Sequence, residues 1–369
     1  GDHRDLHSFP TRRSSDLPVT GDIWVAEPFS SNGRILRYPE FSRLQTMPSP
    51  AADFVLGTVT PPVALAVDSL GRVAAAEVSN RVSLYFPPLW ATNAANFMPN
   101  VEVPRSLNQM HPCCAPGSIA TLWPFSPTGV FGSFETLEAT SLPLPRVLGD
   151  ITVVVSGENF PETEAPLFMV SPTQINFQVP KGVPVGGTID FAVMKQSTGE
   201  ILASGSGVVR AASPAIFLNP AFPIPPGHPL SAGIQVVAQN WGDPQRVSCN
   251  GAPGIVASPV YCPAGVRPAR RGEIIVLYAT GQGFVNGMPE DGAPASAQAV
   301  GTQSLLVGFT NDSIVTPEYS GLVEGLVGVW QINVRVPDTA PPGPLGITLL
   351  YKDLASAIDG KPLTVIMVE

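Results

Sequence analysis

The chain has 369 residues and a formal net charge of −9, and only 13% of its side chains are charged. An acidic chain with scattered charges argues against a nucleic acid or an anionic membrane surface as its partner. Hydrophobic residues make up 44% of the chain, enough for buried cores, while 42 prolines and 35 glycines favour many short strands joined by turns. We therefore expect an all-β protein of two or three domains, with no membrane span because no apolar stretch reaches about 18 residues.

Residues 1–17 differ from the rest of the chain. They are polar, lack the apolar stretch of a signal peptide, and include the segment 7–17, which resembles a translated sequencing adapter fused to an incomplete reading frame. We expect residues 1–17 to be an artefactual or disordered tail. On this interpretation the natural N-terminus is missing, together with any secretion signal.

A short repeat occupies residues 18–90. Each unit has a turn glycine (Gly21 or Gly71), a short apolar strand, a polar turn, and a second strand that ends in an aromatic residue. Three or four strands in a repeat of about 50 residues are typical of a propeller blade. Residues 62–85 resemble the NHL-repeat family of β-propellers. The resemblance implies a partial propeller of fewer than two blades, which cannot close alone because closed propellers have about four to eight.

A longer repeat organises the rest of the chain. The segment around Gly117 recurs 155 residues later, and the Gln-Ile-Asn motif at residues 174–176 recurs 157 residues later. In the first copy Ile175, Phe177 and Val179 would point into a core while Asn176 and Gln178 face out, as in a half-buried strand. We expect two tandem β-sandwich domains, at residues 91–212 and 213–369.

Three motifs suggest what kind of sandwich this is. They are Ser-Pro-Thr-Gln-Ile-Asn-Phe-Gln-Val-Pro at residues 171–180, Ser-Pro-Ala-Ile-Phe at 213–217 and Leu-Tyr-Ala-Thr-Gly-Gln-Gly at 277–283. With them, residues 92–369 resemble the uncharacterised C-terminal domain family known from Solibacter-type secreted proteins, which is similar to immunoglobulin-like (Ig-like) TIG modules. The resemblance implies tandem Ig-like sandwiches on a large secreted bacterial protein, with no assigned activity.

Catalytic motifs are not found in the sequence. Outside the first 17 residues the only histidines are His111 and His228, each in a proline-rich segment, and no nucleophile elbow, HExxH motif or P-loop is present. Gly281-Gln282-Gly283 follows an expected strand but opens no helix, so it indicates a turn rather than a nucleotide site. We expect no catalytic residue and no cofactor.

Acidic clusters are the remaining candidates for a metal site. Glu158, Glu162 and Glu164 are expected to share one loop, where their carboxylate oxygens could bind calcium, and Glu290-Asp291 sits in a Pro/Gly-rich loop. A solvated loop is the simpler interpretation, so the three glutamates are weak calcium candidates.

A disulfide between two of the four cysteines would fit an oxidising compartment. Cys249 and Cys262 flank a turn-rich segment and would close a disulfide that stabilises the fold by about 3 kcal/mol. The adjacent Cys113 and Cys114 leave three alternatives open: a bridge with each other, pairing elsewhere, or free thiols.

Two further groups of residues bear on binding. Amides that recur in both expected sandwiches favour a shared structural role, with outward side chains bonded to a neighbouring loop, over ligand contact; they are Gln174, Asn176, Gln331 and Asn333. Tryptophan faces can stack on sugars, although aromatics in sandwich proteins more often lie in the core. The tryptophans concerned are Trp90, Trp123, Trp241 and Trp330.

These patterns predict a non-catalytic, extracellular structural or binding module at the C-terminus of a larger secreted propeller protein. It would serve in adhesion, in carbohydrate binding or as a spacer, with a polysaccharide or a cell-surface protein as partner. Two alternatives stay open. One is a fragment of a secreted propeller lyase or hydrolase whose catalytic blades are missing, and the other is a C-terminal sorting or anchoring domain.

Overall fold

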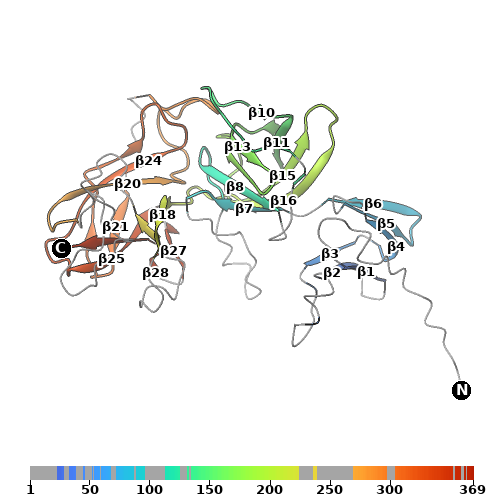
Figure 1. The fold of residues 1–369 in the computed structure, drawn as a ribbon, viewed down its shortest axis with the longest axis horizontal. Coiled ribbons are helices and arrows are strands. Elements are labelled where there is room, and N and C mark those ends of the chain that lie inside the picture. The colour runs from blue at the N-terminus through green and yellow to red at the C-terminus, as the bar shows by residue number, and fades with distance from the viewer. Residues whose placement is uncertain are drawn as a thin grey trace, which may run out of the picture.

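The computed structural model describes residues 23–28, 33–38, 45, 52, 54–58, 60–67, 72–86, 89–95, 113–124, 131–132, 134–223, 236–238, 269–296, 304–351, 354–358, 361–362 and 364–369. Over these residues the chain forms strands and turns without a helix, which confirms the all-β prediction (Figure 1). Its sheets are open, none being closed into a barrel in the described ranges. No described helix is long and apolar enough to cross a membrane. The expected tail at residues 1–17, both histidines, Trp241, Cys249 and Cys262 lie outside the described residues.

The N-terminal unit consists of two three-stranded antiparallel sheets, in the orders β1-β2-β3 and β4-β5-β6. Their strands are β1 Ile23–Glu27, β2 Arg34–Tyr38, β3 Phe54–Gly57, β4 Pro62–Val67, β5 Val73–Glu77 and β6 Arg81–Tyr85. The hairpins β1-β2 and β5-β6 share one register, because Glu27 pairs with Arg34 in the first and Glu77 with Arg81 in the second. The repeat in the sequence is therefore a repeat in structure.

Next along the chain, two five-stranded sheets pack face to face over one hydrophobic core (the first sandwich, at the centre of Figure 1). One sheet has the order β7-β8-β14-β13-β9, with β7 Leu89–Asn93, β8 Ile119–Pro124, β9 Leu137–Glu138, β13 Leu167–Ser171 and β14 Gln174–Gln178. The other has the order β10-β11-β15-β16 with β12 on β11, and its strands are β10 Val147–Leu148, β11 Ile151–Gly157, β12 Phe160–Glu164, β15 Thr188–Lys195 and β16 Ile201–Val208. Phe177 of one sheet meets Phe191 of the other edge to face, with ring centroids 5.6 Å apart.

A second sandwich follows, again with one core between two sheets. The smaller sheet has the order β17-β20-β24-β23, with β17 Ala215–Ile216, β20 Ile274–Thr280, β23 Tyr319–Leu322 and β24 Trp330–Arg335. The larger has the order β18-β19-β29-β25-β21-β22 with β26 on β25, and its strands are β18 Leu218–Pro223, β19 Val236–Ala238, β21 Leu306–Phe309, β22 Ile314–Val315, β25 Gly343–Tyr351, β26 Leu354–Ala355 and β29 Thr364–Val368. A separate hairpin joins β27 Ala357–Ile358 to β28 Lys361–Pro362.

The two sandwiches repeat one strand order and one register. The smaller sheet of the second sandwich corresponds strand by strand to β7-β8-β14-β13 of the first. The pairs Ile119–Gln178 and Thr121–Asn176 recur as Ile274–Arg335 and Val276–Asn333. Alternation of apolar and polar residues sets this register, because a slip of one residue would turn the buried face toward water. Pro180 and Pro337 then follow the paired strands, where a missing amide donor ends the ladder.

Candidate functional site: the joint between the two sandwiches

The repeated amides form the same contact in both sandwiches. Gln174 Nε2 donates to Asn176 Oδ1 at 2.9 Å, and the equivalent pair Gln331 and Asn333 repeats this bond at 2.9 Å. All four side chains are half-buried and point away from the core. In the first sandwich Thr121 Oγ1 also donates to Asn176 Oδ1 at 2.8 Å. The amides therefore bond along their own strand and to a neighbouring strand rather than to a loop.

Two of the candidate tryptophans lie side by side on the same sheet face as Asn176. Trp90 on β7 is paired directly with Trp123 on β8, and both are half-buried. Trp123 Nε1 donates to Thr92 Oγ1 at 3.0 Å. Trp330, by contrast, is fully buried in the core of the second sandwich, where its ring centroid lies 5.5 Å from that of Tyr351.

The three glutamates do not share a loop, which corrects the sequence expectation. Strands β11 and β12 form a hairpin in which Gly157 pairs with Phe160, so Glu158 lies in the turn while Glu162 and Glu164 lie on β12. Proline and acidic residues are typical of loops, yet Phe160–Glu164 pairs with β11 as a strand. Among the described residues no group of three or more His, Cys, Asp or Glu side chains could hold a metal ion.

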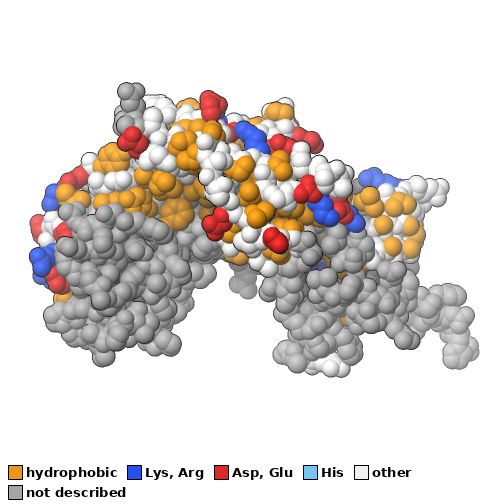
Figure 2. Space-filling view, turned by 45° about the horizontal axis from the view of Figure 1, so that its top comes forward, with side chains coloured by type: hydrophobic (Ala, Val, Ile, Leu, Met, Phe, Trp, Pro, Cys, Tyr) orange, Lys and Arg blue, Asp and Glu red, His pale blue; other side chains and the backbone are white. Residues whose placement is uncertain are grey.

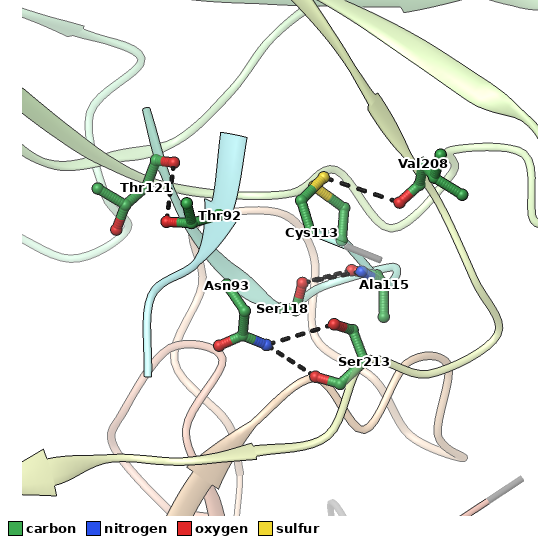
Figure 3. Close-up of a disulfide and its surroundings, with 9 residues drawn as sticks. Thr92, Asn93, Cys113, Ala115, Ser118, Thr121, Val208 and Ser213 are labelled. Carbon is green, nitrogen blue, oxygen red and sulfur yellow. Dashed lines mark hydrogen bonds between the residues drawn. A yellow bond between two sulfur atoms is a disulfide. The ribbon is translucent and has the colours of Figure 1, made fainter. Parts of the chain in front are cut away.

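Of the three possibilities for the adjacent cysteines, the structure shows the disulfide with each other. Cys113 and Cys114 form a disulfide, and both residues are buried in the core of the first sandwich (Figure 3). Cys114 forms a parallel bridge with Val209, and Cys113 Sγ lies 3.7 Å from the carbonyl oxygen of Val208. The backbone bridge between Cys114 and Val209 therefore joins the segment that carries the disulfide to the end of β16.

A dense set of polar contacts joins the first sandwich to the second. Thr280, at the end of β20, is fully buried. Its Oγ1 accepts a hydrogen bond from the backbone amide of Ile119, at the start of β8, and donates to the carbonyl of Gly328, both at 2.9 Å. A second contact runs from Asn93 Nδ2 to the carbonyl oxygen of Ser213 at 2.7 Å (Figure 3).

Residues 281–296, which we name the docking loop, make the remaining contacts. Gln178 Oε1, at the end of β14, accepts from the amide of Gly292 at 2.6 Å. The Leu144 amide donates to the carbonyl of Gly292 at 2.8 Å. The Lys181 amide donates to Asp291 Oδ1 at 2.8 Å, while its Nζ pairs with Glu290 Oε1 at 2.5 Å. The acidic loop noted in the sequence is thus part of the joint.

Glycines allow the two surfaces to approach closely. Gly328 has a φ of +67°, and a Cβ there would lie 2.9 Å from Ile119 Cγ1 and 3.0 Å from the carbonyl oxygen of Gly117. A Cβ on Gly117 itself would lie 1.8 Å from Met288 Cε of the docking loop. A larger residue at Gly328 would press on the backbone of the first sandwich, whereas one at Gly117 would require the Met288 side chain to move.

An ion pair connects the N-terminal unit to the first sandwich. Arg72 Nη1 and Lys195 Nζ each lie 2.8 Å from a carboxylate oxygen of Glu200. The hydrogen bond from Lys195 lowers the pKa of Glu200, and the charges of Lys195 and Arg72 lower it further. These side chains are partly exposed, so the pair contributes less than the buried joint.

The sequence did not reveal Thr280 and Gln178 as joint residues. Both lie at strand ends and look like ordinary polar side chains on the outward face. The only available signal was indirect, since Thr280 belongs to the Leu-Tyr-Ala-Thr-Gly-Gln-Gly motif. Chemically the joint provides hydrogen-bond complementarity and close packing between the two sandwiches.

No protein-family model and no curated protein matches the chain. Among solved structures it is similar to the full extracellular region of plexin A4, with 11% identity and a TM-score of 0.16 over 94% of this chain and 36% of that chain. It is also similar to Salmonella alpha-2-macroglobulin reacted with methylamine, with 11% identity and a TM-score of 0.17 over 92% of this chain and 15% of that chain. The chain spans only a minor part of either protein, and these TM-scores are too low to support an inference.

Proposed function

We propose that the chain is a non-catalytic structural module of a larger secreted protein, in which two Ig-like sandwiches form a rigid spacer behind a partial NHL-type propeller. The buried joint between the sandwiches carries this proposal. Thr280 and Gln178 are buried polar side chains with partners across the joint, and such partners are costly to lose. A linker between independently moving domains needs no contacts of this kind.

The Cys113–Cys114 disulfide supports an extracellular location. Disulfides form and persist in oxidising compartments, and they are rare where the cytosol keeps thiols reduced. Both cysteines lie in the segment before β8 and are buried in the core of the first sandwich, so the bridge belongs to the folded core of the proposed spacer.

Small-angle X-ray scattering of the full chain tests the spacer. The wild type is expected to fit one conformation of the two sandwiches. The double variant Gln178→Ala/Asp291→Ala removes two hydrogen bonds across the joint and should broaden the interatomic distance distribution. The control Asp190→Ala/Ser206→Ala removes an exposed hydrogen bond within the first sandwich and should leave the distribution unchanged. Wild-type scattering from two independently moving bodies would refute the proposal.

Carbohydrate binding is the second candidate function, and the paired tryptophans favour it. Trp90 and Trp123 lie next to each other on one sheet face, close to Thr121 and Asn176, so aromatic surface and amide groups occur together. A polysaccharide panel, screened with and without calcium, tests this function. Saturable binding that Trp90→Ala abolishes while the fold is retained would establish carbohydrate binding. Binding that survives the substitution would exclude this face as the binding site.

The two alternatives drawn from the sequence stay proposals of lower rank. For the lyase-or-hydrolase alternative, the described residues contain no group of three or more His, Cys, Asp or Glu side chains that could hold a metal ion. Secretion of the chain after deletion of residues 213–369 tests the sorting alternative, because export would be lost if those residues were the signal.

A further inference from the structure

The sheet β4-β5-β6 has one apolar face that is open to solvent. We name this the outer face; it consists of Ala64, Ala66, Ala74, Ala76, Val82 and Leu84. Val82 and Leu84 are each 67% exposed, and hydrophobic side chains gather on the described surface of this unit (right side of Figure 2). A continuous exposed apolar face of this kind usually marks an interaction site.

The strand register places these residues on one side of the sheet. Leu84 and Ala66 both pair with Ala74, while Val82 and Ala64 both pair with Ala76. The intervening residues on the same strands point to the opposite side, where Val73 and Ala75 are buried. The six residues that make up the outer face therefore include no charged side chain.

The internal repeat shows which kind of surface covers such a face. In the shared register the residues equivalent to Ala76 and Val82 are Ala26 and Ile35 of the first sheet. Ile35 is fully buried and packs with Val73 and Ala75 on the inner face of the second sheet. The outer face of the first repeat is thus covered by the inner face of the second.

The first repeat has an inner face of its own that is not part of this core. It consists of Ile23, Val25, Glu27, Arg34, Leu36 and Tyr38, of which Leu36 is buried, Arg34 is exposed and the others are half-buried. Glu27 shows the difference most clearly. Its side chain is 38% exposed and pairs with Arg34, whereas the equivalent Glu77 is buried and accepts hydrogen bonds from Thr60 and Tyr85.

We propose that the outer face binds the inner face of the first repeat in a second copy of this chain. The contact would continue, between molecules, the outer-to-inner packing that already joins the two repeats within one molecule. Because the two surfaces differ, the interface is heterologous, and it generates a ring or an open fibre according to the rotation between copies. This inference is independent of the spacer function, which concerns the two sandwiches.

Sedimentation velocity of the full chain over a range of concentrations tests the contact. The wild type is expected to self-associate. Leu84→Glu places a charge on the outer face, at one of its two most exposed apolar side chains, and should abolish association. Ile314→Glu is the matched control, because Ile314 is 63% exposed on β22, far from this unit in sequence, and its replacement should leave association unchanged. A wild type that stays monomeric up to its solubility limit, or a Leu84→Glu chain that associates like the wild type, would overturn the proposal.

A mixing experiment distinguishes head-to-tail packing from a symmetric contact of two outer faces. Val25→Glu, with Tyr38→Lys as a second variant, should block the inner face and also abolish self-association. Each blocked chain retains one intact surface, so an equimolar mixture of Leu84→Glu and Val25→Glu should form a heterodimer. Circular dichroism establishes that each variant is folded. Failure of the mixture to associate, with folded variants and an associating wild type, would refute the head-to-tail contact.

Discussion

Thr280 Oγ1 accepts a hydrogen bond from the backbone amide nitrogen of Ile119 at 2.9 Å. This bond connects the last residue of β20 to the first residue of β8. The same oxygen donates to the carbonyl of Gly328 at 2.9 Å. One buried side chain therefore satisfies a donor of the first sandwich and an acceptor of the second. Because a buried amide without a partner costs more than a typical hydrogen bond contributes, this residue couples the stability of the two sandwiches.

Thr280→Val should lower the free energy of unfolding by about 1–3 kcal/mol, since valine keeps the shape but leaves the Ile119 amide without its acceptor. It should also separate the unfolding of the two sandwiches in denaturant titrations. Thr152→Val is the matched control: Thr152 is equally buried, but its hydroxyl donates to Arg146 within the first sandwich. Identical unfolding profiles for the two variants would contradict the coupling.

Gly281→Ala should destabilise the chain more than Gly186→Ala. Both glycines have a left-handed backbone, with φ of +88° and +89°. The backbone strain that alanine introduces should therefore be the same at each position, about 1–2 kcal/mol. A Cβ on Gly281 would lie 1.7 Å from the carbonyl oxygen of Ser213, whereas nothing lies within 4 Å at Gly186. Thermal unfolding of the two variants measures the difference, and equal losses would show that the backbone around Ser213 yields easily.

Asp150 should contribute to the pH dependence of stability. Hydrogen bonds from the side chain and the backbone amide of Ser197 lower the pKa of Asp150. Because the folded pKa lies below the ordinary value of about 4, the contribution is complete above that pH and is lost as the pH falls through the folded pKa. Asp150→Asn, which tolerates the positive φ of 68°, should flatten the fall in stability below about pH 4.

Chemical denaturation at pH 2 to 7 checks this expectation. Ser197→Ala removes the hydroxyl donor but keeps the backbone donor, so its pH profile should lie between those of the wild type and Asp150→Asn. Profiles that coincide for all three proteins would show that the Ser197 contacts do not hold in solution.

The Cys113–Cys114 bridge should be resistant to reductants while the chain is folded. Both residues are at most 1% exposed, so a reductant reaches the sulfurs only when the surrounding core opens. Peptide mass spectrometry of the native protein should show residues 113 and 114 linked within one peptide. Thiol labelling after reduction should be slow without denaturant and fast with it. Rapid labelling of the folded chain would place the bridge at the surface instead.

The alternation of apolar and polar residues along the strands predicted much of this fold but little of the joint between the two sandwiches. Ile175, Phe177 and Val179 are fully buried as expected, because a period of two residues determines which face of a strand meets the core. Gln178 also faces outward as expected, yet it is only 5% exposed, because the docking loop of the second sandwich covers it. That burial depends on residues more than a hundred positions away, which no local pattern records.

The repeats gave more information than composition did. They located equivalent strands in each pair of units, and the strand registers agree with those offsets. A repeat shows only the features that two units share, however, and the two sandwiches contribute different residues to the joint. Thr280 lies at the end of the second sandwich that contacts the first, so its role could not be inferred from the features that the two copies share.

Asn176→Ala and Asn333→Ala test how far the equivalent amides have diverged. Asn176 Oδ1 accepts from both Gln174 and Thr121, whereas Asn333 Oδ1 accepts from Gln331. On β20 the residue paired with Asn333 is Val276, which has no hydroxyl to donate where the first sandwich has Thr121. Since each hydrogen bond contributes about 1 kcal/mol, Asn176→Ala should cost about 1 kcal/mol more than Asn333→Ala.

Thr121→Val provides the closing comparison for this pair, because it gives the first sandwich the residue found at the equivalent position of the second. In the Thr121→Val background the cost of Asn176→Ala should fall to that of Asn333→Ala, a coupling that a double-mutant cycle measures directly. Denaturant unfolding of the four chains supplies the values. Additive effects of Thr121→Val and Asn176→Ala would mean that the hydroxyl and the amide do not interact, and that the two copies use their amides in the same way despite the difference in sequence.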